Sequence, residues 1–202
     1  MLHYETVDPK TLELLVGLQK IELFKDLRLV GGTSLSLQIG HRVSVDIDLF
    51  GKIEADILEI DQALSVLGNV QKIKDSKHIH IYVINGVKVD IVNYPYPWIS
   101  ELLIEDNIKL ASKKDIAAMK LAAVTGRGTK KDLYDIYFLL QEFSLEEMLA
   151  LYESKYLDGS VFMVLKSLAY FDDAETDEKP VMLKDISWNK VKQKIKNSIL
   201  KK

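Results

Sequence analysis

Two aspartates in the first quarter of the chain, Asp46 and Asp48, alternate with apolar residues in the segment VSVDIDLF. Successive side chains of a β-strand point to opposite faces, so this alternation places both carboxylates on one face and the apolar side chains on the other. Two carboxylates this close repel each other unless a cation lies between them. Mg²⁺ satisfies this need and also binds the oxygens of a substrate phosphate. The alternative interpretation is a half-buried strand with a solvated acidic face.

A glycine-rich turn precedes these aspartates, and its Thr33 lies thirteen positions before Asp46. It consists of Gly31, Gly32, Thr33 and Ser34. An apolar strand end runs into the two glycines, and Thr33-Ser34 is expected to open a short apolar helix. The first N–H groups of a helix have no partner within it and suit an anion such as phosphate. The turn and the Asp-x-Asp strand together therefore predict a site for a metal-bound nucleotide.

A third aspartate, Asp90, lies in a later predicted strand at residues 87–92, where it shares the less apolar face with Lys88. Asn85-Gly86, before this strand, is a strong signal for a two-residue hairpin. A third carboxylate would complete a metal site or act as a general base. The alternative is a surface aspartate that follows a lysine on a hairpin.

These motifs resemble the signature of the DNA polymerase β-like nucleotidyltransferases, and most closely that of the AbiEii toxin branch of bacterial abortive-infection toxin–antitoxin pairs. The resemblance is carried by Gly31-Gly32-Thr33-Ser34 and by Arg42-x-Ser44-x-Asp46-Ile47-Asp48-Leu49-Phe50. It implies that Asp46, Asp48 and Asp90 bind Mg²⁺ or Mn²⁺ and carry out catalysis. It also implies that the glycine turn and Arg42 contact the nucleotide.

A lysine in the second half of the chain, Lys120, is the only charged residue in the apolar run IAAMKLAAV. A lysine is almost never buried without a partner, and Asp132 and Asp135 on the next predicted helix are one candidate. A nucleotide phosphate is the other. The residues Lys120, Arg127, Lys131, Asp132 and Asp135 resemble the C-terminal motif of the AbiEii branch, although that branch usually has arginine in place of Lys131. The resemblance implies that Lys120, Asp132 and Asp135 face the cleft and bind nucleotide, and we expect Lys120 to meet its anion only when nucleotide binds.

The order of predicted elements indicates an α/β (α+β) fold. We expect a polymerase β-like lobe with a mixed sheet and flanking helices at residues 1–98, followed at 99–202 by an all-α lobe that completes the active-site cleft. The predicted helices span residues 9–25, 53–67, 113–124, 130–143, 145–156 and 160–171, with a last basic helix after Trp188. The predicted strands span 43–49, 70–74, 78–84 and 87–92, with one more edge strand at 107–110. Residues 171–178 are acidic and predict an exposed loop.

The composition is that of a soluble cytoplasmic protein. The chain has 202 residues and no cysteine, which excludes disulfides and thiolate metal sites. No apolar run approaches the roughly twenty residues of a membrane span, so no membrane partner is expected. The net charge of −3 gives no general attraction to nucleic acid, so any contact with RNA would be local. The lysines of the last helix would provide such a contact, or would simply be solvated opposite an apolar stripe that packs on the protein.

The predicted function is transfer of a nucleoside monophosphate from a triphosphate to an acceptor hydroxyl. The family resemblance implies a toxin that acts on RNA or tRNA and has a cognate antitoxin. One alternative is a nucleotidyltransferase of small molecules, of the antibiotic-modifying kind. A second is an inactive nucleotide-binding regulatory module, although a module without turnover would have no need for three mutually repelling aspartates.

Overall fold

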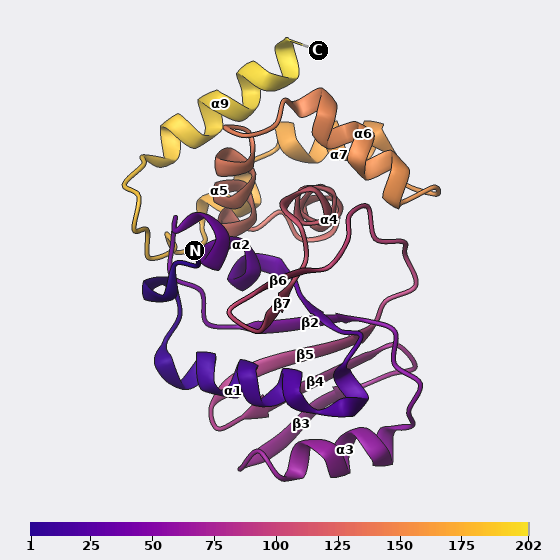
Figure 1. The fold of residues 1–202 in the computed structure, drawn as a ribbon. Coiled ribbons are helices and arrows are strands. Elements are labelled where there is room, and N and C mark those ends of the chain that lie inside the picture. Colours follow the sequence, from indigo (N-terminus) through magenta and orange to yellow (C-terminus); the bar gives the residue numbers. More distant parts are fainter. Residues whose placement is uncertain (202) are drawn as a thin grey trace. The chain divides into compact units, whose positions relative to one another are not determined.

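The computed structural model describes residues 1–201 and divides into two compact units (Figure 1). The sheet unit contains Met1–Gly40, Ser44–Pro95 and Leu102–Ala111. The helical unit contains His41–Val43, Tyr96–Glu101 and the chain from Ser112 onward. The division differs from a single boundary after residue 98, because residues 102–111 return to the sheet and residues 41–43 belong to the helical unit.

The sheet unit is built on a seven-stranded mixed sheet with the strand order β3-β4-β5-β2-β1-β7-β6. Its strands are β1 (Arg28–Leu29), β2 (Ile47–Gly51), β3 (Val70–Asp75), β4 (Ile79–Ile84), β5 (Val87–Asn93), β6 (Leu103–Glu105) and β7 (Ile108–Leu110). The central strand β2 pairs parallel with β5 and antiparallel with β1. The predicted mixed sheet is thus confirmed.

The segment expected to form an edge strand lies inside the sheet instead. Strand β7 pairs with both β1 and β6, so β6 is the edge strand. The turn between β6 and β7 uses Asp106 and Asn107 in the left-handed region, with φ of 50° and 62°. Aspartate and asparagine tolerate this conformation better than other non-glycine residues, which explains a hairpin without glycine.

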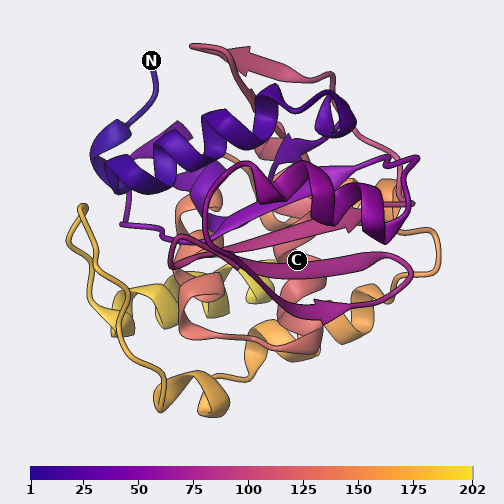
Figure 2. The same cartoon turned by 90° about the horizontal axis from the view of Figure 1, so that it is seen from below.

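Three helices belong to the sheet unit: α1 (Pro9–Lys20), α2 (Gly31–Ile39) and α3 (Ile57–Ser65). The 3-10 turns η1 (Tyr4–Thr6) and η2 (Glu22–Phe24) complete it. Helices α1 and α3 cover one face of the sheet (Figure 2), where their apolar residues and those of the strands form a buried core. Both helices are shorter than predicted. Helix α3 begins only after Asp56, because this residue and Glu59 form a capping box there.

The helical unit contains α4 (Lys113–Gly126), α5 (Lys130–Leu139), α6 (Leu145–Lys155), α7 (Val161–Ala169), α8 (Asp172–Glu175) and α9 (Trp188–Leu200). Helix α4 packs against α5, α6 and α7. Serine side chains cap the N-termini of α4, α6, α7 and α9, at Ser112, Ser144, Ser160 and Ser187. The acidic segment predicted as a loop contains the short helix α8. Within residues 1–201, no helix combines the length and apolar character that a membrane span requires.

Candidate active site

Two of the three predicted catalytic aspartates lie side by side. Asp48 on β2 and Asp90 on β5 are register partners in a parallel strand pair, so their side chains point to the same face of the sheet. Leu49 and Ile91, the next residues along, point to the opposite face and are fully buried in the core under α1 and α3. The carboxylates are therefore on the face of the sheet that these two helices do not cover.

Asp48 also lies against the predicted glycine turn. The backbone N–H of Val30 donates a hydrogen bond of 2.9 Å to the carbonyl of Asp48. A Cβ atom at Gly31 would overlap Asp48 Oδ2, and Gly31 has a φ of +67°, in the left-handed region. Only glycine satisfies both constraints without strain. The turn and the carboxylate are thus packed directly on each other.

Helix α2 begins at Gly31, two residues before the expected start. No side chain caps its N-terminus, where Val30 is the N-cap residue. Its first N–H groups therefore have no acceptor from an N-cap side chain. They carry the positive end of the helix dipole, which favours an anion.

The hydroxyl groups of Thr33 and Ser34 are buried and bind other groups of the protein. Thr33 Oγ1 donates to the carbonyl of Asp46 and lies 2.9 Å from Ser44 Oγ. Ser34 Oγ accepts a hydrogen bond of 3.1 Å from Gln38 Nε2. Thr33 and Ser34 are 1% and 0% exposed. The Thr33 side chain therefore positions the backbone at Asp46, and only the backbone of this turn remains a candidate phosphate ligand.

Asp46 stands immediately before β2, which starts at Ile47 rather than at residue 43. The preceding segment does not extend the strand, because Arg42 forms a β-bridge with Met182 and the Val43 N–H donates to Val181 O at 2.8 Å. Asp46 and Asp48 are half-buried. The expected continuous strand from 43 to 49 is therefore too long at its start.

The chemistry of the carboxylates fits a hard divalent cation. Carboxylate oxygens are the usual ligands of Mg²⁺ and Mn²⁺, and Mg²⁺ often takes only one or two of them together with water and substrate phosphate. Among residues 1–201, no three aspartate, glutamate or histidine side chains lie close enough to hold a metal ion by themselves. Lys88 Nζ lies 2.6 Å from Asp90 Oδ1 and provides a local positive charge.

The helical unit contains a buried ion-pair network around Lys120. Lys120 Nζ lies 2.9 Å from Asp132 Oδ1 and 2.6 Å from Asp135 Oδ2, and the three side chains are at most 5% exposed. Arg42 binds Asp135 with both ends of its guanidinium, at 2.7 and 2.9 Å. Arg127 binds Asp132 at 2.9 Å from the exposed side. The expectation that Lys120 lies in an open cleft and meets an anion only when nucleotide binds is therefore wrong.

The ion pairs between the aspartates and their lysine and arginine partners determine the pKa values in this network. Burial alone would raise the pKa of Asp132, but Lys120, Arg127 and Thr129 lower it to about 2. Burial is likewise outweighed at Asp135, where Lys120 and Arg42 hold the pKa well below its ordinary value. Burial lowers the pKa of Lys120, but Asp135 and Asp132 together raise it above its ordinary value. Each group in the network therefore stays charged at neutral pH.

Two buried polar residues of the helical unit, His41 and Lys155, were not identified from the sequence. His41 Nε2 lies 2.8 Å from Asp135 Oδ1, and burial lowers the pKa of His41, so its ring is neutral at pH 7. Lys155 is fully buried, 2.8 Å from Asp115 Oδ1 and 2.7 Å from the carbonyl of Pro97. A signal for Lys155 was present, because it occupies a position of the apolar stripe of α6, three residues after the buried Tyr152.

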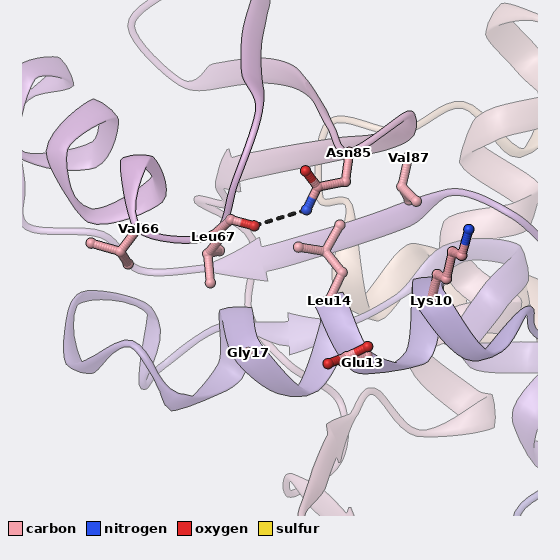
Figure 3. Close-up of a pocket in the computed structure, with 8 residues that line it drawn as sticks. All are labelled: Lys10, Glu13, Leu14, Gly17, Val66, Leu67, Asn85 and Val87. Carbon is pink, nitrogen blue, oxygen red and sulfur yellow. Dashed lines mark hydrogen bonds between the residues drawn. The ribbon is translucent and has the colours of Figure 1, made fainter.

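A pocket of about 540 Å³ in the sheet unit lies away from the carboxylates (Figure 3). It is lined by α1, the chain after α3 and the β4–β5 hairpin, where Asn85 Nδ2 donates to Leu67 O at 2.8 Å. Val87 and Leu14, which line it, belong to the side of the sheet covered by α1 and α3. It therefore plays no part in the chemistry of Asp48 and Asp90.

Comparison with known proteins identifies the family of this chain independently of the site geometry. A model of the family described as nucleotidyl transferase AbiEii toxin, Type IV TA system, matches residues 13–199. An uncharacterized protein of Aquifex aeolicus (strain VF5) is 33% identical over 195 residues, which are 93% of each chain. The structure of JHP933 from Helicobacter pylori has a TM-score of 0.59 at 17% identity and covers 96% of this chain and 92% of its own. The nucleotidyltransferase toxin MenT4 from Mycobacterium tuberculosis H37Rv has a TM-score of 0.58 at 14% identity and covers 95% and 84%. The chain therefore belongs to the AbiEii nucleotidyltransferase toxin family.

Proposed function

We propose that this nucleotidyltransferase transfers a nucleoside monophosphate from a triphosphate to a hydroxyl group of RNA, with Asp46, Asp48 and Asp90 as its catalytic residues. The main support is the geometry of the sheet unit, where Asp48 and Asp90 share one face and Gly31 packs directly on Asp48. This arrangement places paired carboxylates beside an uncapped helix N-terminus. The carboxylates suit the metal ion of a metal-bound triphosphate, and the helix N-terminus suits its phosphates.

The proposed reaction is an in-line displacement at the α-phosphorus. The acceptor oxygen forms a bond to phosphorus, and the bond from phosphorus to the pyrophosphate oxygen breaks. Asp90 accepts the proton of the attacking hydroxyl, while the N–H groups at the start of α2 orient the phosphates. Asp48 and Asp90, the register pair, would hold a bound Mg²⁺ or Mn²⁺ together with the substrate phosphate, with Asp46 as the proposed third ligand once nucleotide is bound, and the ion would neutralise charge that develops on the phosphate oxygens.

For the network around Lys120 we propose a structural role before a nucleotide-binding one. Lys120 already has two carboxylate partners, and Arg42 already binds both oxygens of Asp135. A phosphate that recruited Lys120 would have to replace Asp132 or Asp135, leaving a buried carboxylate with fewer partners. These residues therefore support the helical unit first, and any contact with nucleotide would come at the expense of that pairing.

The choice of acceptor and partner rests on the family. Its description as a toxin of a Type IV toxin–antitoxin system supports a cellular target and a cognate antitoxin. RNA is a suitable target for a toxin, because its terminal hydroxyls can accept a nucleotide and the modification stops its use.

The experiment is incubation of the protein with each labelled triphosphate, Mg²⁺ and total cellular RNA, with small-molecule alcohols such as aminoglycosides as competing acceptors. We expect label on RNA with wild-type protein and none above background with Asp46→Asn or Asp48→Asn. Asp158→Asn, an exposed aspartate outside the site, is the matched control and should keep the wild-type rate. Thermal melts of all variants establish that they are folded. Near wild-type transfer by Asp48→Asn would refute the carboxylate assignment, and label on alcohols alone would refute RNA as the acceptor.

A further inference from the structure

Helix α9 carries a row of lysines on its outer side. Lys190 and Lys194 lie on the helix at positions i and i+4, and Lys201, at i+11, is the residue that directly follows α9. The helical spacing places all three on one side, and all three are exposed. Val191 and Ile195, on an adjacent side of the helix, are fully buried. Helix α9 packs through that side against α5 and α7 (Figure 1). The apolar stripe thus fixes which side of α9 faces solvent.

This lysine row, made of Lys190, Lys194 and Lys201, has no acidic residue beside it on its own helix. Helix α9 contains no acidic residue, although the whole chain has a net charge of −3. Within residues 1–201, the ammonium groups of these three lysines make no ion pair, whereas Lys192 of the same helix is paired with Glu175 at 2.5 Å. Like charges at spacings of four residues destabilise a helix. A polyanionic partner would relieve this repulsion.

A hollow beside the lysine row provides a second and different feature. Its volume is about 220 Å³, and Lys194 and Lys201 form part of its wall together with Phe143, Ser198 and Glu146. Phe143 is half-buried and offers an aromatic surface. Sites for single-stranded nucleic acid combine cations along the backbone with aromatic side chains that contact bases. The carboxylate of Glu146 disfavours a second phosphate in the hollow but can accept a hydrogen bond from a base amino group.

We propose that the lysine row of α9 binds the phosphates of a single-stranded segment of the RNA acceptor, with one base in the hollow beside Phe143. The rise of the helix places Lys190 and Lys194 about 6 Å apart along its axis, and Lys194 and Lys201 about 10 Å apart. Three flexible lysines at these spacings can each reach a separate phosphate. The choice of RNA as the polyanion rests on the proposed function. The charge of the lysine row and the hollow are observed independently of that function.

The test measures binding of a short single-stranded oligoribonucleotide to the full chain by fluorescence anisotropy, without triphosphate and over a range of salt concentrations. The variant is Lys190→Gln/Lys194→Gln/Lys201→Gln. The control, Lys20→Gln/Lys77→Gln/Lys166→Gln, removes the same charge from exposed lysines that make no ion pair within residues 1–201. We expect the row variant to bind at least about tenfold more weakly and to reduce the slope of log K against log salt by about 2, since each phosphate contact contributes about 0.7. The control should match wild type. Equal binding by the row variant, or equal weakening by the control, would overturn the proposal.

Two further measurements separate this inference from the proposed function. If wild type labels RNA, the row variant should raise the KM for RNA with kcat unchanged, and an unchanged KM would overturn the inference alone. If wild type labels no RNA, the proposed function fails, but loss of RNA binding in the row variant would still support the binding surface. Phe143→Leu should weaken binding without changing the salt slope. Unlabelled single-stranded RNA and polyglutamate are then compared as competitors at the same concentration of charge. If both displace the labelled RNA equally well, RNA is not the specific partner.

Discussion

Replacing Lys120 by methionine tests whether the buried ion-pair network holds the helical unit together. The change keeps an unbranched apolar side chain of nearly the same length and removes the ammonium group, which lies 2.9 Å from Asp132 and 2.6 Å from Asp135. Both carboxylates are fully buried and would lose a cation that they share. Removing one partner of a buried pair costs about 3–5 kcal/mol, because the remaining charge stays buried without full compensation.

The structure indicates a value near the lower end of this range. The pKa of Asp132 is lowered from 3.8 to about 2, which corresponds to about 2.5 kcal/mol of favourable interaction with the ionised form. After the substitution, Arg127 still binds Asp132 and Arg42 still binds both oxygens of Asp135. We therefore expect a loss of about 3 kcal/mol, which lowers Tm by roughly 6–12 °C for a protein of this size.

Tryptophan fluorescence is the appropriate assay, because both tryptophans, Trp98 and Trp188, belong to the helical unit that contains Lys120. Lys166→Met on α7 is the matched control, since Lys166 is exposed, and its effect should stay within about 0.5 kcal/mol. The free energy of unfolding at pH 7 is measured for wild type and both variants by denaturant titration. Equal stability of Lys120→Met and Lys166→Met would refute the structural role of the network.

The pH dependence of the same comparison gives a second test. Because the pKa of Asp132 is lower in the folded protein than in the unfolded chain, its contribution is fully present above about pH 4 and is lost as the pH falls toward 2. The Lys120→Met variant lacks the part of this contribution that comes from Lys120. The stability difference between wild type and variant should therefore shrink between pH 4 and pH 2, and a constant difference would contradict the assignment.

Three further substitutions address the remaining parts of the structure. Gly31→Ala should reduce both Tm and transfer activity, because the added Cβ overlaps Asp48 Oδ2 and the backbone is left-handed there; a fully active, stable variant would show that the turn is not packed on the carboxylate. Asp90→Asn should keep the melting temperature within a few degrees while nucleotide transfer falls at least about a hundredfold, and assays over a range of pH would expose any alternative base. Lys155→Met should cost about 3–5 kcal/mol by leaving Asp115 buried without its cation, and a variant as stable as wild type in urea would exclude this.

Local patterns in the sequence were sufficient to predict the family, the mixed fold and the position of most helices and strands. The alternation around Asp90 and the Asn85-Gly86 turn predicted a hairpin, and the structure confirms it, with Asn85 and Gly86 at φ of 51° and 86°. Such features depend on residues close together in the chain, where backbone preferences and apolar periodicity act directly. The family motif worked for the same reason, since it is a short run of residues with a fixed order.

Pairing between distant segments was decided only by the tertiary structure. The sequence showed that Lys120 needed an anion and offered two candidates, but burial of Asp132 and Asp135 beside it made the protein itself the partner. The sequence likewise did not predict that the hydroxyl of Thr33 binds the carbonyl of Asp46. In both cases the outcome depends on which polar groups lose contact with water when the chain folds, because a buried charge or donor binds the nearest available partner. That information lies in three-dimensional packing, which spacing along the chain does not determine.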